Sequence, residues 1–381
     1  MPRARPLLTV LLSLIAVYTL LHYLFPRTQL CPPLDALTPA NATLGFSTIL
    51  AVSHSRSPRR PSLLWAANLT DLDIVIPEQP AWTIGDIEDF RAREGSSISS
   101  GSAKAWLGHL FALRCFLNSD HETALILEDD TDFDLSIRHS QVPLLASAIR
   151  SLLTNASTTN DASNFWSPTS NWDILYPGHC DDLPSPPAYL AQPHLAYHDP
   201  SVPALPLMHP DTAYFLSTLN IPPQTRFLHR AYWPFCTFAY AVNRRSAAAI
   251  LESMAREPEG GSSAFDVELL SACQDRGWSC WSVAPELFHH GVGASEIFRT
   301  DHDDGDGLGE GEVKRSGRGT WNVGCGARHG QLWVGEEDAG RRREMKSVVR
   351  GAVKRGECPV DKVAEERSWT GCEWGGCGAQ S

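Results

Sequence analysis

The feature that most constrains the fold is a short apolar run that ends in acidic residues. Residues 123–127 read TALIL, and Glu128, Asp129 and Asp130 follow directly. A continuous apolar run of strand length is typical of a strand buried on both faces, as parallel sheets require. Ligands of open α/β sheets bind beyond the carboxyl ends of such strands. The sequence therefore predicts a layered α/β domain with acidic side chains at its ligand-binding edge.

Strand and helix patterns alternate on both sides of this run. We expect further strands at 47–53, 72–76, 172–176, 235–242 and 279–283, and helices at 102–118, 141–153, 245–256 and 265–276. This alternation indicates α/β layering. The Pro-rich residues 184–210 are expected to be mostly irregular, and the Gly- and charge-rich residues after 299 to form a poorly packed tail.

An uncharged apolar segment at residues 7–25 predicts a membrane anchor. Its nineteen residues, at about 1.5 Å each in a helix, nearly span a hydrocarbon core of roughly 30 Å. Arg3 and Arg5 precede it, so the positive-inside rule predicts a cytosolic N-terminus and a lumenal remainder. The expected order is a cytosolic tail (1–6), signal anchor (7–25), stem (26–44), catalytic domain (45–300) and tail (301–381). A cleaved signal peptide is the alternative, although its apolar core is usually shorter.

Other features agree with a lumenal compartment. Glycosylation sequons begin at Asn41, Asn68 and Asn155. In an oxidising lumen we expect pairing among Cys180, Cys236, Cys273, Cys280, Cys325, Cys358, Cys372 and Cys377, with connectivity left open and a local link among the last three considered. Cys115 lies in a helical pattern and is expected to be a buried thiol.

The negative charge is concentrated in two places. The chain has 32 basic and 44 acidic residues and a net charge of −12, and residues 120–134 and 301–312 hold seven and six acids without a base. No basic stripe lies outside the tail, which argues against nucleic acid as the main partner. Carboxylates this close repel one another unless a cation neutralises them, and Mg²⁺ or Mn²⁺ prefers oxygen ligands. The first cluster therefore predicts a metal–diphosphate site, with a solvated acidic loop as the alternative.

Two other acidic motifs fit less well. An EF-hand loop starting at Asp130 needs Gly at its sixth and Glu at its twelfth position, where Leu135 and Gln141 stand. A phosphatase with an aspartate nucleophile could use Asp130 and Asp132, but the later acid pair that it needs, at 304–306, follows no apolar strand. We therefore rank both below the metal–diphosphate site.

Five stretches in order resemble glycosyltransferase family 25, the family of bacterial lipooligosaccharide and collagen galactosyltransferases. They are 101–114 (GSAKAWLGHLFALR), 124–130 (ALILEDD), 172–180 (WDILYPGHC), 236–244 (CTFAYAVNR), and 265–270 (FDVELL) with 285–290 (PELFHH). The resemblance covers roughly residues 46–297. Two departures leave donor and acceptor specificity open: the turn after the first strand keeps only the family's arginines, and the helix opens with Gly101 and Ser102.

The resemblance implies a GT-A-like nucleotide-sugar-binding domain with a mixed, mostly parallel sheet flanked by helices. It implies a metal-dependent, inverting transfer of a sugar, most often galactose, from a UDP-sugar to a hydroxyl of a glycan or glycoprotein. The protein would then be a single-pass type II enzyme of the Golgi or endoplasmic reticulum membrane. A membrane-tethered, catalytically inactive glycan-binding or scaffold protein of the same fold is the rival hypothesis.

Site residues follow from the resemblance and from simple chemistry. The expected metal ligands are Glu128, Asp130, His289 and His290; the expected donor-binding residues are Arg56, Arg59, Arg60, Lys104, His109 and Asp129; and the expected catalytic base is Asp266. Arginines fork onto phosphate oxygens, and an inverting transfer needs a carboxylate within reach of the acceptor hydroxyl. The alternatives are a solvated basic loop for the arginines, an interior histidine for His109, a surface pair for the two late histidines, and a helix-capping role for Asp266.

Overall fold

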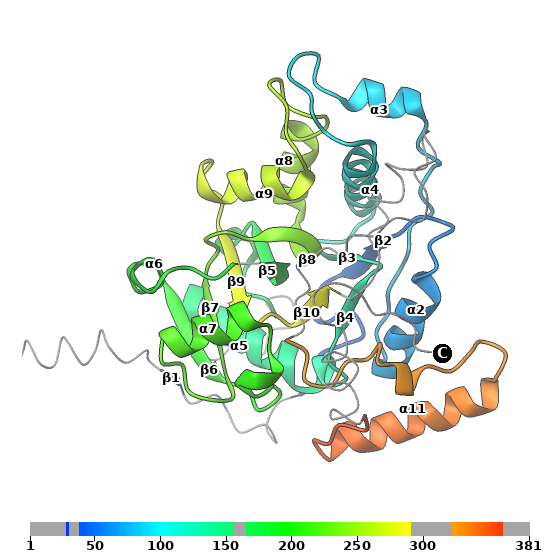
Figure 1. The fold of residues 1–381 in the computed structure, drawn as a ribbon, viewed down its shortest axis with the longest axis vertical. Coiled ribbons are helices and arrows are strands. Elements are labelled where there is room, and N and C mark those ends of the chain that lie inside the picture. The colour runs from blue at the N-terminus through cyan, green and yellow to red at the C-terminus, as the bar shows by residue number, and fades with distance from the viewer. Residues whose placement is uncertain (1–27, 30–37, 155–164, 181, 291–321, 361–381) are drawn as a thin grey trace, which may run out of the picture.

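The computed structural model describes residues 28–29, 38–154, 165–180, 182–290 and 322–360 (Figure 1). The predicted anchor, the sequon at Asn155, the acidic run 301–312, Cys372 and Cys377 lie outside these residues. Within the described part of the chain, no helix is both long and apolar enough to cross a bilayer.

A mixed sheet forms the centre of the molecule. Its strands are β2 (Thr48–Val52), β3 (Thr123–Glu128), β5 (Ile174–Cys180), β6 (His194–His198), β7 (Thr225–Arg230), β8 (Phe235–Asn243) and β9 (Cys280–Ala284). They lie in the order β6-β7-β9-β5-β8-β3-β2, and the two-residue β1 (Thr28–Gln29) pairs with the β6 edge. A separate two-stranded sheet joins β4 (Thr131–Phe133) to β10 (Phe288–His290).

The expectation of a mostly parallel sheet is wrong. Only β2–β3, β5–β9 and β1–β6 run parallel among the described strands, whereas β8 lies antiparallel to both β3 and β5. Strand β8 is buried along most of its length, like β3. A strand covered on both faces is apolar in either direction, so the apolar run predicted burial but not orientation.

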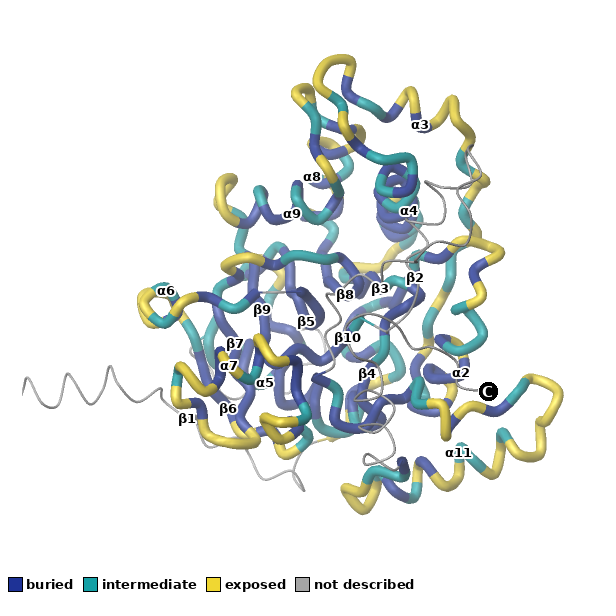
Figure 2. Tube along the Cα trace, viewed as in Figure 1, coloured by how far each residue is buried: buried dark blue, intermediate teal, exposed yellow. Residues whose placement is uncertain are grey.

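Helices cover both faces of the sheet, as the alternation predicts (Figures 1 and 2). One core packs α4 (Ser100–Leu117), α8 (Arg244–Ser253) and α9 (Phe265–Gln274) against alternate residues of β3, including Ala124 and Ile126. The other packs α2 (Arg60–Thr70) and α5 (Val142–Thr154) against Leu125 and Leu127. The remaining helices are α3 (Ile84–Phe90), α6 (Pro186–Ala191), α7 (Pro210–Thr218) and α11 (Ala339–Lys354). Both faces of β3 are thus buried by side chains that alternate along the strand.

Local signals explain the predicted elements that are confirmed. Helix α8 begins after Asn243, whose side chain accepts a hydrogen bond from the backbone of Ser246, as a cap requires. Helix α4 is capped by Ser99, whose hydroxyl accepts a hydrogen bond from the backbone of Ser102, so the helix begins two residues before the expected start. The strand expected at 72–76 is reduced to one bridge between Val75 and Leu50. The Pro-rich segment 184–210 contains two regular elements, α6 and β6, with turns and loops around them.

Within the described residues, three disulfides join six of the cysteines that were expected to pair: Cys180–Cys236, Cys273–Cys280 and Cys325–Cys358. The proposed link within the last three cysteines is wrong for Cys358, because Cys358 pairs with Cys325. Cys115 is a free thiol, but it is half-buried rather than buried.

The described part of the tail is packed, against expectation. Helix α11 buries Val349 and Ala352, and its Lys346 and Arg350 form ion pairs with Asp71 at the end of α2. Apolar residues of this region also join the core beneath α2 and α5, among them Leu332, Val334 and Val360.

Candidate functional site

The candidate site lies where β3 ends. Glu128 is the last residue of β3 and is half-exposed, whereas Asp129 and Asp130 form the turn to β4 and are buried. The same turn is fixed from the β8 side, because the Thr131 hydroxyl donates to the carbonyl of Phe238 at 2.7 Å. The acids therefore stand at the carboxyl end of a buried strand, where the sequence predicted them.

Arginines from the start of α2 reach the acidic turn. Arg59 Nη1 lies 3.3 Å from Asp130 Oδ2 and 3.5 Å from Asp129 Oδ1. Arg60 donates to the hydroxyl of Ser53, which in turn donates to Asp129 Oδ2 at 2.5 Å. Asp129 is thus engaged by protein groups on both oxygens, which makes it part of the support of the site.

The two late histidines point in opposite directions. His290 Nε2 lies 3.2 Å from Asp130 Oδ2, whereas His289 Nδ1 lies 3.4 Å from Glu286 Oε1 and is almost fully buried. Consecutive residues of a strand face opposite sides, and both belong to β10. The structure therefore brings only His290 to the acidic turn.

Glu128 is held by an interior network. Its Oε1 accepts from the Thr237 hydroxyl at 2.7 Å and lies 3.3 Å from His109 Nε2. His109 is buried, its other nitrogen lies 3.2 Å from the Tyr240 hydroxyl, and its ring stacks on Phe265 at 5.1 Å. His109 is therefore the interior histidine of the alternative hypothesis, and it orients Glu128 from behind.

Asp266 lies beside this network at the start of α9. Its Oδ2 accepts the backbone N–H of Cys236 at 3.1 Å, and its Oδ1 that of Val267 at 2.9 Å. Burial raises the pKa of the Asp266 carboxyl despite these hydrogen bonds, and the charge of Glu128 raises it further. The side chain keeps some exposure. A carboxylate that is partly desolvated but accessible is suited to accept a proton.

The structure places the two other predicted donor-binding residues on the loop before α2 and on α4. Arg56 is exposed on the loop between β2 and α2. Lys104 is half-buried on α4, and the five positions that separate it from His109 place the two about 140° apart around the helix. The arginine triplet is therefore split, with Arg59 and Arg60 turned to the site and Arg56 to solvent.

The acidic turn offers one oxygen to a cation. Among the described residues, Asp130 Oδ1 is a buried oxygen that accepts no hydrogen bond, which fits a carboxylate with room for a metal ion. A group of three or more His, Cys, Asp or Glu side chains spaced to hold a metal is not present within the described ranges. The carboxylate of Asp130 and the imidazole of His290 thus fit a metal in kind, and further ligands would come from a donor diphosphate and water.

Arg328 contacts the acidic turn, and sequence reasoning did not single it out. Its guanidinium lies behind the acidic turn and donates to the carbonyls of Asp129 and Thr131 at 2.7 and 2.9 Å. It is 199 residues from Asp129 and stands in a Gly-rich segment without a strand or helix pattern. The one nearby residue that could have drawn attention to this segment is Cys325, three residues earlier, because a cysteine expected to form a disulfide indicates that its segment is attached to the domain.

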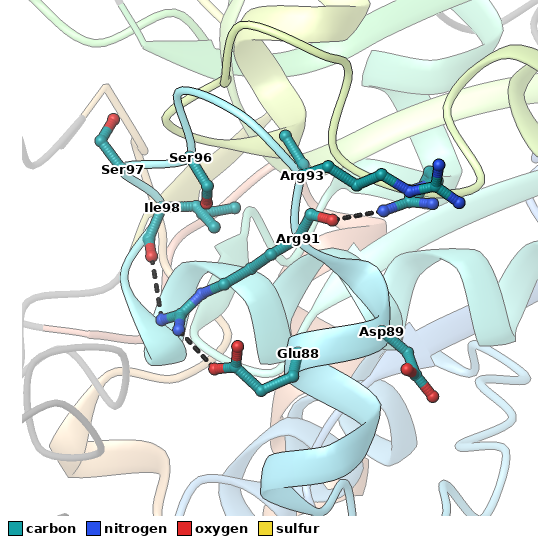
Figure 3. Close-up of a pocket in the computed structure, with 9 residues that line it drawn as sticks. Glu88, Asp89, Arg91, Arg93, Ser96, Ser97 and Ile98 are labelled. Atoms are coloured by element: carbon teal, nitrogen blue, oxygen red, sulfur yellow. Dashed lines mark hydrogen bonds and ion pairs between the residues drawn. The ribbon is translucent and has the colours of Figure 1, made fainter.

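A hollow of about 750 Å³ lies elsewhere, beside α3 (Figure 3). Two of the three arginines that line it contact neighbouring protein groups: Arg91 pairs with Glu88 at 2.6 Å, and Arg256 donates to the carbonyl of Arg91. Because these charged groups are already paired with protein groups, we do not place the candidate functional site in this hollow.

Comparison with known proteins adds no assignment. The chain matches no protein-family model, and no curated protein matches it.

Proposed function

We propose that this protein is a metal-dependent glycosyltransferase that moves a sugar, galactose in the first instance, from a UDP-sugar to a hydroxyl of a glycan or glycoprotein. The observation that carries the proposal is the grouping of Asp130, Glu128 and Asp266 around the end of β3, with Arg59 beside them. Two kinds of carboxylate stand together there: one buried and paired with cations, the other partly exposed with a raised pKa. Such a division of environments is typical of acid–base sites.

The donor half of the site would consist of Asp130, His290 and Arg59. A divalent ion, Mn²⁺ or Mg²⁺, would neutralise the charge that develops on the leaving diphosphate. Arg59 is close enough to Asp130 to share a diphosphate with that ion, because it already lies 3.3 Å from the carboxylate. Glu128, with 29% of its side chain exposed, lies close enough to His290 to influence its charge, and it would be a further carboxylate of the donor half.

The acceptor half of the site would be Asp266. An inverting transfer needs a base that takes the proton of the attacking hydroxyl. The two backbone N–H groups that hold Asp266 fix its carboxylate in one orientation. Its raised pKa makes it a better proton acceptor once ionised than an ordinary surface aspartate.

The cellular setting is part of the same proposal. A GT-A-like domain tethered by residues 7–25 would face the lumen of the Golgi or endoplasmic reticulum. Three disulfides in the described residues support an oxidising compartment.

The test is donor binding and transfer by the full-length chain in detergent. Calorimetry with UDP-galactose, UDP-glucose and GDP-mannose in the presence of Mn²⁺ identifies the donor, and hydrolysis of that donor measures turnover. We expect UDP-galactose to bind best and Asp130→Asn to abolish both signals. Asp89→Asn, which removes an exposed acid of α3, is the matched control. A preference for GDP-mannose contradicts the donor assignment.

The rival is a catalytically inactive glycan-binding or scaffold protein. Arg59 and Arg328 favour it, since they already compensate much of the acidic charge without a metal. It predicts glycan binding without Mn²⁺-dependent UDP binding, and no loss of affinity in Asp130→Asn. Turnover of any UDP-sugar excludes it.

A further inference from the structure

Residues 322–334, here called the strap, run beside β4 and pair with the end of that strand through a single antiparallel bridge between Gly326 and Asp134. The N–H of Ala327 donates to the carbonyl of Phe133 at 2.8 Å, and the N–H of Leu135 to that of Cys325 at 2.9 Å. The N–H of Cys325 also donates to Asp134 Oδ2 at 2.7 Å. Strand β4 is therefore held between β10, which carries His290, and the strap.

Arg328 leaves this strap and enters the space between the acidic turn and α2. Its Nη1 bridges the carbonyls of Asp129 and Thr131, which flank Asp130 in sequence. Its Nη2 donates to the hydroxyl of Ser62 at 2.6 Å and reaches the carbonyl of Arg59 at 3.5 Å. One guanidinium thus contacts both the turn that carries Asp130 and the helix start that carries Arg59.

The main chain at Arg328 contributes as well. Its N–H donates to Asp132 Oδ1 at 3.0 Å, while the same oxygen accepts from Phe133 at 2.7 Å. Asp132, one of the acids in the sequence cluster, is therefore engaged in holding the strap and is turned away from a ligand role. The planar, forked donor set of arginine is what permits four acceptors to be served at once.

The strap is anchored on both sides of Arg328. The Cys325–Cys358 disulfide ties it to the residues after α11. On the other side, the Trp65 indole donates to the carbonyl of Leu332 at 2.7 Å. These anchors hold the strap on both sides of Arg328, whose side chain is half-buried.

We propose that Arg328 is a positioning residue of the donor site, which holds the Asp129–Asp130 turn and Arg59 at the spacing that a metal–diphosphate group requires. This inference rests on the proposed function. The strap lies outside the segment that resembles the transferase family. We infer that it sets the geometry of the donor site without contacting the donor.

The test compares three variants of the full-length chain. Arg328→Gln removes the charge and the fork, Arg328→Lys keeps the charge alone, and Arg342→Gln loosens the tail without reaching the acidic turn. Mn²⁺ affinity is measured by electron paramagnetic resonance, UDP affinity by calorimetry, and the mobility of residues 128–133 by hydrogen exchange. Kinetics with the best donor separate kcat from KM.

We expect Arg328→Gln to weaken Mn²⁺ and UDP binding by about 10–100-fold, as loss of a group that orients ligands does. Hydrogen exchange should accelerate at residues 128–133, and KM for the donor should rise more than kcat falls. Arg328→Lys should recover part of the binding, and Arg342→Gln should bind like the wild type even if its melting temperature drops.

The possible failures are distinguishable. If the wild type binds Mn²⁺ and UDP and Arg328→Gln binds them equally well, the positioning role is wrong and the proposed function stands. If Arg328→Gln and Arg342→Gln lose binding in proportion to lost stability, the role of Arg328 is general and the proposal is overturned. If the wild type binds neither Mn²⁺ nor UDP, the proposed function is wrong, and Arg328 has no role in a donor site. Hydrogen exchange at residues 128–133 still shows whether Arg328 holds the acidic turn in place.

Discussion

His290 Nε2 lies 3.2 Å from Asp130 Oδ2, and this contact joins the small β4–β10 sheet to the end of β3. Burial on its own lowers the pKa of His290, but the neighbouring Asp130 charge and hydrogen bond outweigh it and raise that pKa above its ordinary value. For Asp130, burial on its own raises the pKa. The positive charges of His290, Arg59 and Arg328 outweigh burial and bring the pKa of Asp130 below its ordinary value. Each partner thus stabilises the charged form of the other.

The sign of these shifts gives a pH window for stability. The contribution of His290 is fully present below its unfolded pKa of about 6.5 and is lost as the pH rises through its higher folded pKa. That of Asp130 is present above its unfolded pKa of about 3.9 and is lost as the pH falls through its lower folded pKa. The pair is therefore strongest between roughly pH 4 and 6.5.

We expect His290→Gln to lower the free energy of unfolding by about 1–3 kcal/mol at pH 5.5, the range of a hydrogen bond to a charged group. The difference should be smaller at pH 9, because the contribution of charged His290 is lost as the pH rises through its raised pKa. Thermal unfolding of the full-length chain in a chelator, at both pH values, measures this. His121→Gln, at an exposed histidine, is the control. A difference that does not change with pH would show that His290 stabilises by packing alone.

How far the sequence predicts this site depends on chain distance. Asp130 and Arg59 each follow a recognisable strand, so their convergence at one sheet edge could be expected. The separate tasks of the acids could not: Asp132 and Asp134 are neighbours of Asp130 in sequence, yet their carboxylates accept hydrogen bonds from the strap. A composition argument treats them as one cluster, because only the fold separates them.

The metal hypothesis rested partly on repulsion between these acids, and the structure changes that argument. Arg328 lies 199 residues from Asp129 in the chain and places a positive charge beside the acidic turn. No pattern in the sequence around either residue predicts this contact. The orientation of His289 and His290, in contrast, could be predicted from the sequence. Once residues 288–290 are recognised as a strand, alternation of side chains predicts that only one of the two histidines faces the acids.

Asp266 provides a prediction for catalysis. Because a base must be ionised to accept a proton, activity should fall as the pH drops through the raised pKa of Asp266, at a higher pH than for an ordinary aspartate. Asp266→Asn should lower kcat by about 10²–10⁴-fold and leave donor affinity unchanged. Because Asn has a single acceptor oxygen, one of the two backbone N–H groups loses its partner, so the free energy of unfolding should fall by no more than one hydrogen bond contributes, about 0.5–1.5 kcal/mol. Asp173→Asn, at a surface ion pair, is the control. A loss of donor binding in Asp266→Asn contradicts the base assignment.

The pair Asp199–Arg226 provides a prediction for stability. Arg226 Nε lies 2.8 Å from Asp199 Oδ2, and the two side chains are 1% and 0% exposed. Arg226 also donates to the carbonyl of Glu286, so the pair fixes the chain just before β10. Asp199→Asn leaves a buried cation without its counter-charge and should cost about 3–5 kcal/mol. Arg245→Ala, at the exposed pair with Asp173, should cost about 0–1 kcal/mol. Equal costs in denaturant titrations would contradict this difference.

The Cys325–Cys358 disulfide provides the last prediction. It closes a loop of 33 residues, for which the chain-entropy model gives about 3–4 kcal/mol. Cys358→Ser should lower the melting temperature and, because Cys325 anchors the strap, also weaken Mn²⁺ and UDP binding. Cys273→Ser removes the disulfide that closes a seven-residue loop, so it should cost less stability, about 2–3 kcal/mol, and leave binding intact because it is remote from the strap. Calorimetric unfolding and UDP titration of both variants measure the contrast. Equal loss of UDP affinity in the two would show that disulfides support the site only through overall stability.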